Sequence, residues 1–254
     1  MASIAAKKEV GCIFPYSPFH LEEIAVILLT DINNEEQLQH INEHLDAIRE
    51  ISDLWEYLPG GDNPIQLVKE NPLTSFNMRV LENYWITSEC SGLEEMIDSQ
   101  RSQKHFEDYS KKVKVEPKGR IRSREEIRNE VGIDLRGLSH ANPSQVLLDD
   151  RVQQIIAQKV RNYGIEIEGF PRGAALRVDH DLTRKTIDCL MRTLNEVGFY
   201  ADKPGKHRSY MFDVGHTIYA TRATSFLVGD SRLSKRAEAI FSFLEAETQI
   251  IAPN

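Results

Sequence analysis

Residues 225–230 read Ser-Phe-Leu-Val-Gly-Asp, a short apolar run that ends in a carboxylate. A continuous apolar run of this kind is typical of a strand that is buried on both faces. It is followed by a basic amphipathic helix over 233–244 and by a second apolar strand over 248–251. Strand, helix and strand in succession predict a parallel α/β arrangement. We therefore expect Asp230 at the carboxyl end of a buried strand, where ligands bind in open α/β sheets.

A second carboxylate, Asp213, precedes this run in the sequence. We expect it to open a helix that carries His216 on the same side. The helix before it is expected over 181–197, with Asp181 as its cap, Gly198 as its stop and an apolar face that packs in the core. Two carboxylates that meet at the edge of a sheet repel each other unless a cation or a proton lies between them. This order of elements favours a divalent-metal site.

The start of the chain predicts a strand followed by a helix. Residues 11–14, Gly-Cys-Ile-Phe, are apolar. Ser17 and the proline after it are typical of a helix start, with Ser as the N-cap and Pro at the first helical position. The helix over 18–28 carries Glu23, and a second amphipathic helix is expected over 35–51. This part of the chain supplies a third acid.

The composition indicates a cytoplasmic protein. The chain has 254 residues, 41% hydrophobic and 28% charged, which fits one large domain or one domain with an insertion. No apolar run reaches the ~18 residues of a membrane span, and the N-terminus lacks the layout of a signal peptide. The three cysteines are widely spaced, as expected of reduced thiols. The net charge of -8 argues against non-specific adhesion to nucleic acid.

Two local clusters are nevertheless basic. Residues 111–128 hold eight Lys or Arg and three Glu, and a smaller cluster at 203–208 lies just before Asp213. The first cluster reads as a solvated surface. The second is more interesting because a basic segment beside an acidic site could hold the backbone of a nucleic acid.

In this order, the residues resemble the PIN-like nuclease family. The resemblance rests on Ser17 and Glu23 after the first strand, on Asp213 with His216, on Val228-Gly229-Asp230 with Lys235, and on the closing strand at 248–251. It covers about residues 11–55 and 180–252.

The resemblance implies an α/β fold of three layers with a central parallel sheet. Residues 1–60 and 179–254 would form the two parts of the PIN-like domain, and residues 61–178 would be a mostly helical insertion. The acid, the basic helix and the closing strand of the family would correspond to Asp230, the helix over 233–244 and the strand over 248–251.

The resemblance also implies a metal-dependent endoribonuclease, in a toxin or defence context. Glu23, Asp213 and Asp230 would be catalytic and would bind Mg²⁺ or Mn²⁺, which prefer carboxylates and water. The residues themselves do not distinguish RNA from DNA as the substrate. RNA is expected because the resemblance favours it. The residues expected to contact the substrate are Ser17, His216, Lys235 and Arg208.

One departure from the family leaves alternatives open. The family carries an Asp on its first strand, whereas only Glu9 precedes Gly11 among the acids of this chain. We expect the opening strand and first metal ligand to be missing, by truncation or by divergence. One alternative is therefore a catalytically impaired PIN-like protein that works in binding or scaffolding. Another is an α/β regulatory domain whose acids are structural.

Overall fold

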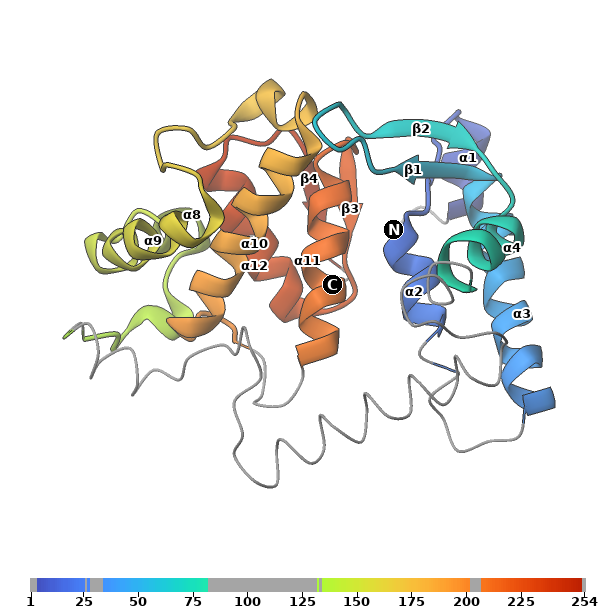
Figure 1. Ribbon diagram of the computed structural model, residues 1–254, viewed down its shortest axis with the longest axis horizontal. Coiled ribbons are helices and arrows are strands. Elements are labelled where there is room, and N and C mark those ends of the chain that lie inside the picture. The colour runs from blue at the N-terminus through green and yellow to red at the C-terminus, as the bar shows by residue number, and fades with distance from the viewer. Residues whose placement is uncertain are drawn as a thin grey trace. The chain divides into compact units, whose positions relative to one another are not determined.

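The computed structural model describes residues 4–25, 27, 34–81, 132, 134–201 and 207–252. These residues are mixed α/β and mostly helical, and they contain two short sheets (Figure 1). The chain divides into two compact units, Met1–Leu58 with Gln66–Pro117, and Pro59–Ile65 with Lys118–Asn254. The helical insertion expected over 61–178 stays a prediction.

The first unit combines a helical layer with a β-hairpin. Its helices are α1 (Ile4–Glu9), α2 (Pro18–Ala25), α3 (Asn34–Ser52) and α4 (Pro72–Ser75), followed by a π-helix at Phe76–Leu81. β1 (Trp55–Leu58) and β2 (Gln66–Lys69) pair antiparallel. A small core joins α2, α3 and the start of the π-helix, and its buried residues are Tyr16, Leu21, Ile24, Ala25, Ile41, Leu45 and Phe76.

The first unit contains the predicted helix start at Ser17 but not the predicted strand over 11–14. The helix begins as predicted, because α2 starts at Pro18 directly after Ser17. The strand predicted over 11–14 is wrong: these residues form no regular secondary structure, and Ile13 is 46% exposed. Beyond it, Tyr16 makes an isolated parallel bridge to Glu56. A strand needs a neighbour along its length for its backbone groups, and within the described residues the segment 11–14 has none.

A buried carboxylate ties the hairpin to the helical layer. Glu56 of β1 is fully buried. Its Oε2 lies 3.1 Å from the Tyr16 hydroxyl and accepts a hydrogen bond of 2.9 Å from Ser75 Oγ. A buried charge is tolerated only where polar partners surround it. These contacts therefore fix β1 against α4 and against the segment that precedes α2.

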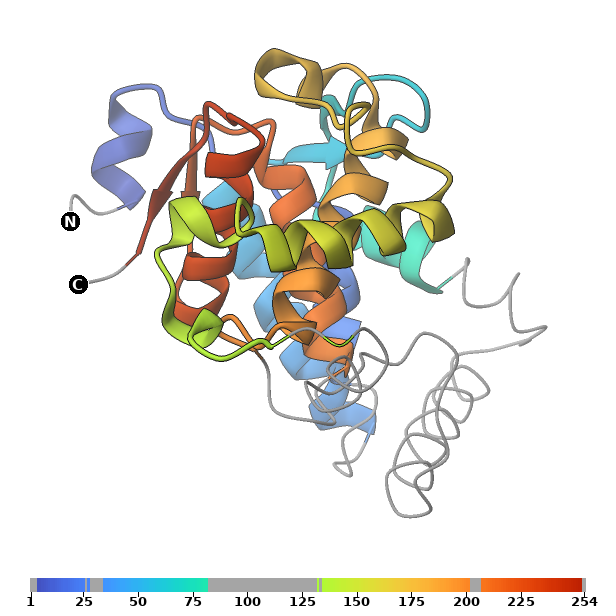
Figure 2. The ribbon, with the colours of Figure 1, turned by 90° about the vertical axis from the view of Figure 1, so that its left-hand side faces the viewer.

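The second unit is a helical core with a short, partly exposed parallel sheet at one side. Figures 1 and 2 show α9 packed on α10, which in turn packs on α11 and α12. Its buried core draws on every one of the longer helices. The elements in chain order are η3 (Leu138–His140), α8 (Pro143–Val146), α9 (Asp150–Tyr163), η4 (Gly173–Arg177), α10 (His180–Glu196), α11 (His207–Ala220), β3 (Ser225–Leu227), α12 (Ser231–Phe243) and β4 (Gln249–Ile251).

The strand–helix–strand prediction is confirmed. β3 and β4 pair in parallel, with Ser225 opposite Gln249, and α12 connects them. The register is extended by a hydrogen bond of 3.0 Å from the Val228 N–H to the Ile251 carbonyl. β3 is less buried than expected, because within the described residues it has β4 as its single neighbouring strand.

Two predicted helix starts are wrong. α11 begins at His207, so Asp213 lies inside the helix and does not open it. No Gly or Pro stands between His207 and Asp213, so nothing in the sequence breaks the helix there. α10 begins at His180, and Asp179 caps it by accepting the Leu182 N–H.

The loop at 59–65 completes the start of α10. The carbonyls of Gly61 and Asn63 accept the N–H groups of Asp181 at 2.9 Å and of His180 at 3.2 Å. The first N–H groups of a helix have no partner within the helix, so the loop satisfies two of them. Gly60 allows this loop shape, because a Cβ there would collide with the backbone of residues 63 and 64.

A buried ion pair links α9 to α10. Lys159 Nζ lies 2.5 Å from Glu196 Oε1, and the two side chains are 10% and 4% exposed. Removing one member of such a pair leaves a buried charge without its partner, which is far more destabilising than replacing both members with apolar groups.

We therefore predict that Glu196→Gln lowers the free energy of unfolding by about 3–5 kcal/mol. The double variant Lys159→Met/Glu196→Leu should recover most of this loss. Urea denaturation measures both. The exposed pair Lys235–Glu238 is the control, and Glu238→Gln should cost less than about 1 kcal/mol. A Glu196→Gln protein as stable as the wild type would mean that the pair is not a packed part of the core.

Candidate functional site

Asp230 lies at the carboxyl edge of the parallel sheet, as predicted. β3 ends at Leu227, and Asp230 is the N-cap of α12. Its Oδ1 accepts the N–H groups of Arg232 at 2.7 Å and of Leu233 at 3.3 Å. The side chain is 46% exposed, and within the described part of the chain no hydrogen bond or ion pair engages its Oδ2. One oxygen thus caps the helix and lies 3.9 Å from Arg232 Nε, and the side chain as a whole is partly exposed.

Asp213 has a different environment from Asp230. Its Oδ2 accepts a hydrogen bond of 2.7 Å from Arg236 Nη2 of α12. The Arg236 side chain has no solvent exposure, and that of Asp213 is 14% exposed. This carboxylate is therefore held in a buried ion pair, in contrast to the prediction that it serves as an open metal ligand.

The sequence reading missed Arg236, although a signal was present. Arg236 stands with Leu233, Ala237 and Ile240 on one face of α12, and all four are buried. Helical spacing places an Arg on this apolar face. A charge there requires a carboxylate from a neighbouring element, which Asp213 supplies.

A second polar cluster joins α9, α10 and α11. Asp188 accepts hydrogen bonds from the Tyr163 hydroxyl at 2.7 Å and from Arg192 Nε at 3.1 Å. The Arg192 guanidinium lies 5.9 Å from the centre of the Tyr210 ring. Burial, and then the nearby Asp188 charge, raise the pKa of Tyr210 well above its ordinary value. Asp188, like Asp213, is thus paired with an arginine.

The predicted site residues of the first unit are Ser17 and Glu23. Ser17 is buried, and its N–H and Oγ lie 3.1 Å and 3.0 Å from His20 Nδ1. The Ser17 N–H can only donate, so Nδ1 of His20 is its acceptor. The His20 side chain thus reaches back to Ser17 at the start of α2, as the third residue of a helix does in a capping box. Glu23 is an exposed residue on α2.

The remaining predicted residues lie on α11 and α12. His216 is half-buried, one turn beyond Asp213. Lys235 Nζ forms an ion pair of 2.8 Å with Glu238 Oε2. Arg208 is in the first turn of α11, but its side chain lies outside the described part of the structure, as do residues 203–206 of the predicted basic cluster.

The described residues contain no group of three or more His, Cys, Asp or Glu side chains that could hold a metal ion. Asp230 supplies one partly exposed carboxylate of the kind that such an ion prefers, with Arg232 Nε 3.9 Å from its Oδ1. Asp213 fits it only if Arg236 gives up its contact. Glu23 belongs to the other unit, so its meeting with the two aspartates stays a prediction.

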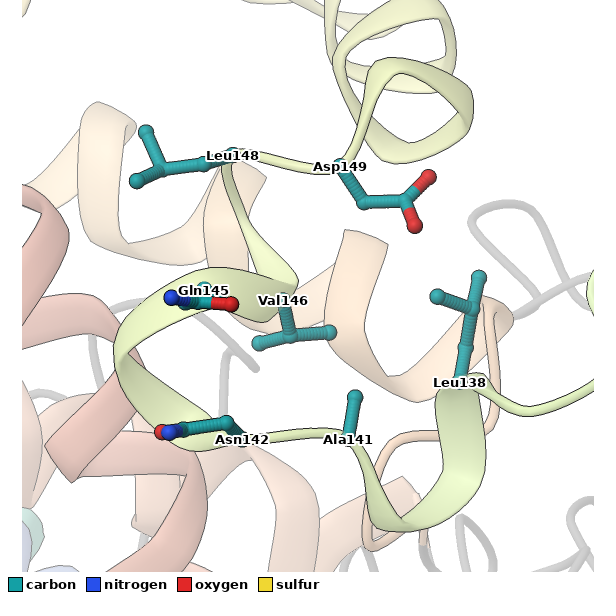
Figure 3. A pocket seen from close by; sticks show the side chains of 7 residues that line it. All are labelled: Leu138, Ala141, Asn142, Gln145, Val146, Leu148 and Asp149. Atoms are coloured by element: carbon teal, nitrogen blue, oxygen red, sulfur yellow. The ribbon is translucent and has the colours of Figure 1, made fainter.

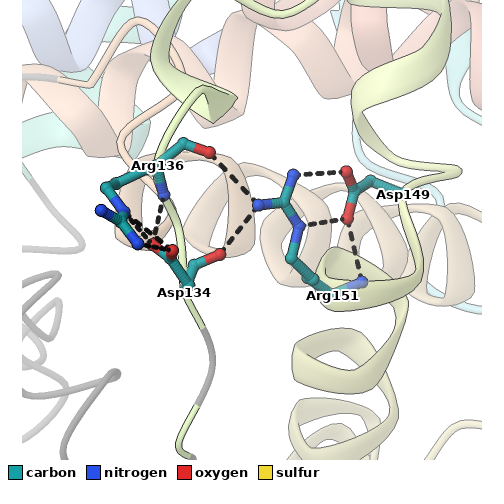
Figure 4. Close-up of polar contacts among 4 residues, drawn as sticks. All are labelled: Asp134, Arg136, Asp149 and Arg151. Atoms are coloured by element: carbon teal, nitrogen blue, oxygen red, sulfur yellow. Dashed lines mark hydrogen bonds and ion pairs between the residues drawn. The ribbon is translucent and has the colours of Figure 1, made fainter.

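A surface hollow of about 330 Å³ lies elsewhere in the second unit. Figure 3 shows Leu138, Ala141 and Val146 around it, with Asp149 at its rim. Asp149 is its one acidic side chain, and Arg151 binds both of its oxygens, at 2.9 Å and 2.7 Å (Figure 4). These hydrogen bonds lower the pKa of Asp149. The carboxylate of this hollow is therefore already neutralised.

Arg151 also holds the wall of this hollow. Its Nη1 donates to the carbonyls of Asp134 at 2.8 Å and of Arg136 at 3.2 Å (Figure 4). The guanidinium thus fixes the segment before η3 against the start of α9, which is a structural role.

Comparison with family models, with curated proteins and with solved structures finds no match to this chain. Within the described residues, none of the helices has both the length and the apolar character that a membrane span requires.

One buried histidine of the second unit predicts that its stability depends on pH. His180 is buried at the start of α10, and its ring centre lies 5.5 Å from that of Tyr219. Nδ1 has no hydrogen-bond partner within the described residues. Burial, and then the charge of Arg184, lower the pKa of His180 below 6.5. The nearby carboxylates of Asp179 and Asp181 act in the opposite direction and do not reverse the shift.

We predict that the protein loses stability as the pH falls below about 6.5, the pKa that His180 regains on unfolding. Below that pH, the unfolded chain binds a proton that the folded protein does not take up until a lower pH, so the free energy of unfolding decreases. His180→Gln should remove this part of the pH dependence, whereas the exposed His140→Gln should keep it. Urea denaturation between pH 5 and pH 8 measures the effect, and identical profiles for the wild type and His180→Gln would contradict it.

Proposed function

We propose that this chain is a cytoplasmic, metal-dependent endoribonuclease with a PIN-like three-layer fold. The observation that carries the proposal is the place of Asp230, a partly exposed carboxylate at the carboxyl edge of a parallel strand–helix–strand unit. In open α/β sheets this edge is the usual ligand site. Residues 61–178 would be a helical insertion into that fold.

In this proposal, Glu23, Asp213 and Asp230 hold Mg²⁺ or Mn²⁺. When bound, the ion lowers the pKa of a water molecule and stabilises charge on the phosphate. The carboxylate of Asp230 at the start of α12 is also a reason for a cation to bind there. The start of a helix attracts phosphate, but a carboxylate cap repels it unless a cation lies between them.

The basic residues of α11 and α12 would position the RNA backbone. Lys235 stands in the second turn of α12, and Arg208 in the first turn of α11. Contacts of this kind hold a nucleic acid without reading its sequence. His216 would contact the same phosphate, and Ser17 would keep the start of α2 in place beside the substrate.

A second candidate function is supported by the Asp213–Arg236 ion pair. A carboxylate neutralised by a buried guanidinium is a weak metal ligand. The chain would then be a catalytically impaired PIN-like protein that binds RNA without cutting it. Metal-independent binding of RNA, with no cleavage, is the property that separates this candidate from the first.

We predict that Asp230→Asn abolishes Mn²⁺-dependent cleavage of a labelled single-stranded RNA while the fold is retained. Asn caps helices as well as Asp does, so the loss of charge at the helix start should cost only about 0.3–1 kcal/mol. Asp230→Asn therefore separates the metal role from the capping role. Asp213→Asn does not, because it also removes the partner of Arg236.

The matched control is Asp149→Asn, because Asp149 is also a helix N-cap in the second unit. It should keep full activity, and EDTA should stop cleavage by both the wild type and the control. Equal cleavage by the wild type and Asp230→Asn would remove Asp230 from the mechanism. If the wild type does not cleave RNA or DNA in Mn²⁺ yet binds RNA in fluorescence anisotropy, the second candidate replaces the first.

A further inference from the structure

The start of α10 is held by a loop from a distant part of the chain. The Asn63 carbonyl accepts the N–H of His180 at 3.2 Å, and the Gly61 carbonyl accepts that of Asp181 at 2.9 Å. The loop at 59–65 belongs to the second unit, whereas the strands on either side of it, β1 and β2, belong to the first. Most residues of the loop are exposed. The loop therefore buries little of its own surface, and two backbone hydrogen bonds tie it to α10.

His180 lies at the same place with its side chain buried. The residue is 7% exposed, its ring centre lies 5.5 Å from that of Tyr219, and Nδ1 has no hydrogen-bond partner within the described residues. The partial positive charge at the start of a helix disfavours a cation there, in addition to the effect of burial. His180 thus holds the loop through its backbone, while its neutral ring packs against α11.

The carboxylates next to His180 in the chain already have partners. Asp179 accepts a backbone N–H of the first turn of α10 at 2.9 Å. Hydrogen bonds from Lys185 and Arg184 lower the pKa of Asp181 to about 2, so this group stays charged near neutral pH. Because neither carboxylate is free to pair with the ring, a protonated His180 has to reach water. The other titratable or charged side chains on the elements packed here are Asp62 of the loop, Arg177 of η4, and His216 and Tyr219 of α11.

We propose that His180 is a pH-sensitive switch that releases the loop at 59–65 from α10 in acid. A protonated ring reaches water when the first turn of α10 opens, and this turn opens when the Gly61 and Asn63 carbonyls give up their N–H partners. Such an opening exposes less apolar surface than separating α10 from α11, whose contact lies in the core. The switch requires no metal ion, so it is independent of the proposed nuclease activity.

The size of the effect follows from the linkage between proton binding and opening. In the open form the ring regains its ordinary pKa of 6.5, whereas burial lowers the pKa of the ring in the closed form. Above that pH neither form binds the proton, and the closed form has its full stability. Below it the open form is protonated first, so the ratio of closed to open molecules falls by up to about tenfold for each pH unit. The fall ends at the lower pKa of the closed form.

Amide hydrogen exchange of the full chain, followed by NMR between pH 5 and pH 8, tests the switch. The His180 and Asp181 amides should have lower protection factors than that of Leu190 in the middle of α10, because the loop opens while the core stays folded. Below pH 6.5, both should fall by up to about tenfold for each pH unit. His180→Gln should remove this fall. His140→Gln is the matched control, because His140 also lies 5.5 Å from a tyrosine ring but is exposed, and it should keep the fall.

The coupling between the loop and the ring must also be reciprocal. Gly60→Ala gives the loop a Cβ that collides with the backbone of residues 63 and 64, so it should release the loop at neutral pH. An NMR titration should then find the pKa of His180 closer to 6.5 than in the wild type.

Three results would overturn the switch. In the first, the His180 and Asp181 amides exchange as slowly as that of Leu190 at every pH, so that the loop opens only when the whole unit unfolds. In the second, the protection of these two amides does not change with pH. In the third, Gly60→Ala speeds their exchange but leaves the pKa of His180 unchanged. The first two are measured on the wild type and the third on Gly60→Ala, so the test stands even if His180→Gln does not fold.

Discussion

A guanidinium with no access to solvent governs the assembly of the second unit. Arg236 must keep a carboxylate partner, and Asp213 provides it across the contact between α12 and α11. Because α12 also joins β3 to β4, this pair fixes α11 against the parallel sheet. A buried ion pair is often no more stabilising than apolar packing. Its contribution here is to specify one arrangement of helices, with the apolar core filling the space around it.

The two edges of the parallel sheet have different roles. At the amino edge, Arg177 Nε donates to the Thr221 carbonyl at the end of α11, and Arg172 Nη1 donates to the Phe243 carbonyl at the end of α12. These bonds satisfy carbonyls that a helix end leaves without partners. The carboxyl edge holds the exposed Asp230. At this edge its Oδ1 caps α12, and its side chain is 46% exposed.

The sequence predicted the elements whose signals are local. β3, α12 and β4 follow from one apolar pattern and one cap, and all three are present within one or two residues of their expected bounds. The strand over 11–14 failed because strand formation depends on a neighbour that local sequence does not reveal. The hairpin of β1 and β2 was missed although the Gly-Gly-Asp-Asn turn between two β-prone runs is a hairpin signal. For the site, the position of Asp230 was predictable, whereas the pairing of Asp213 with Arg236 joins residues 23 apart in sequence.

The central claim is that the carboxyl edge of β3 binds a divalent cation through Asp230. Crystals of the full chain grown at a saturating concentration of Mn²⁺ test it most directly, through the anomalous scattering of manganese. The account predicts an anomalous peak at about 2.0–2.2 Å from Asp230 Oδ2. A map with manganese bound at other carboxylates, such as Asp149, and none at Asp230 would contradict it.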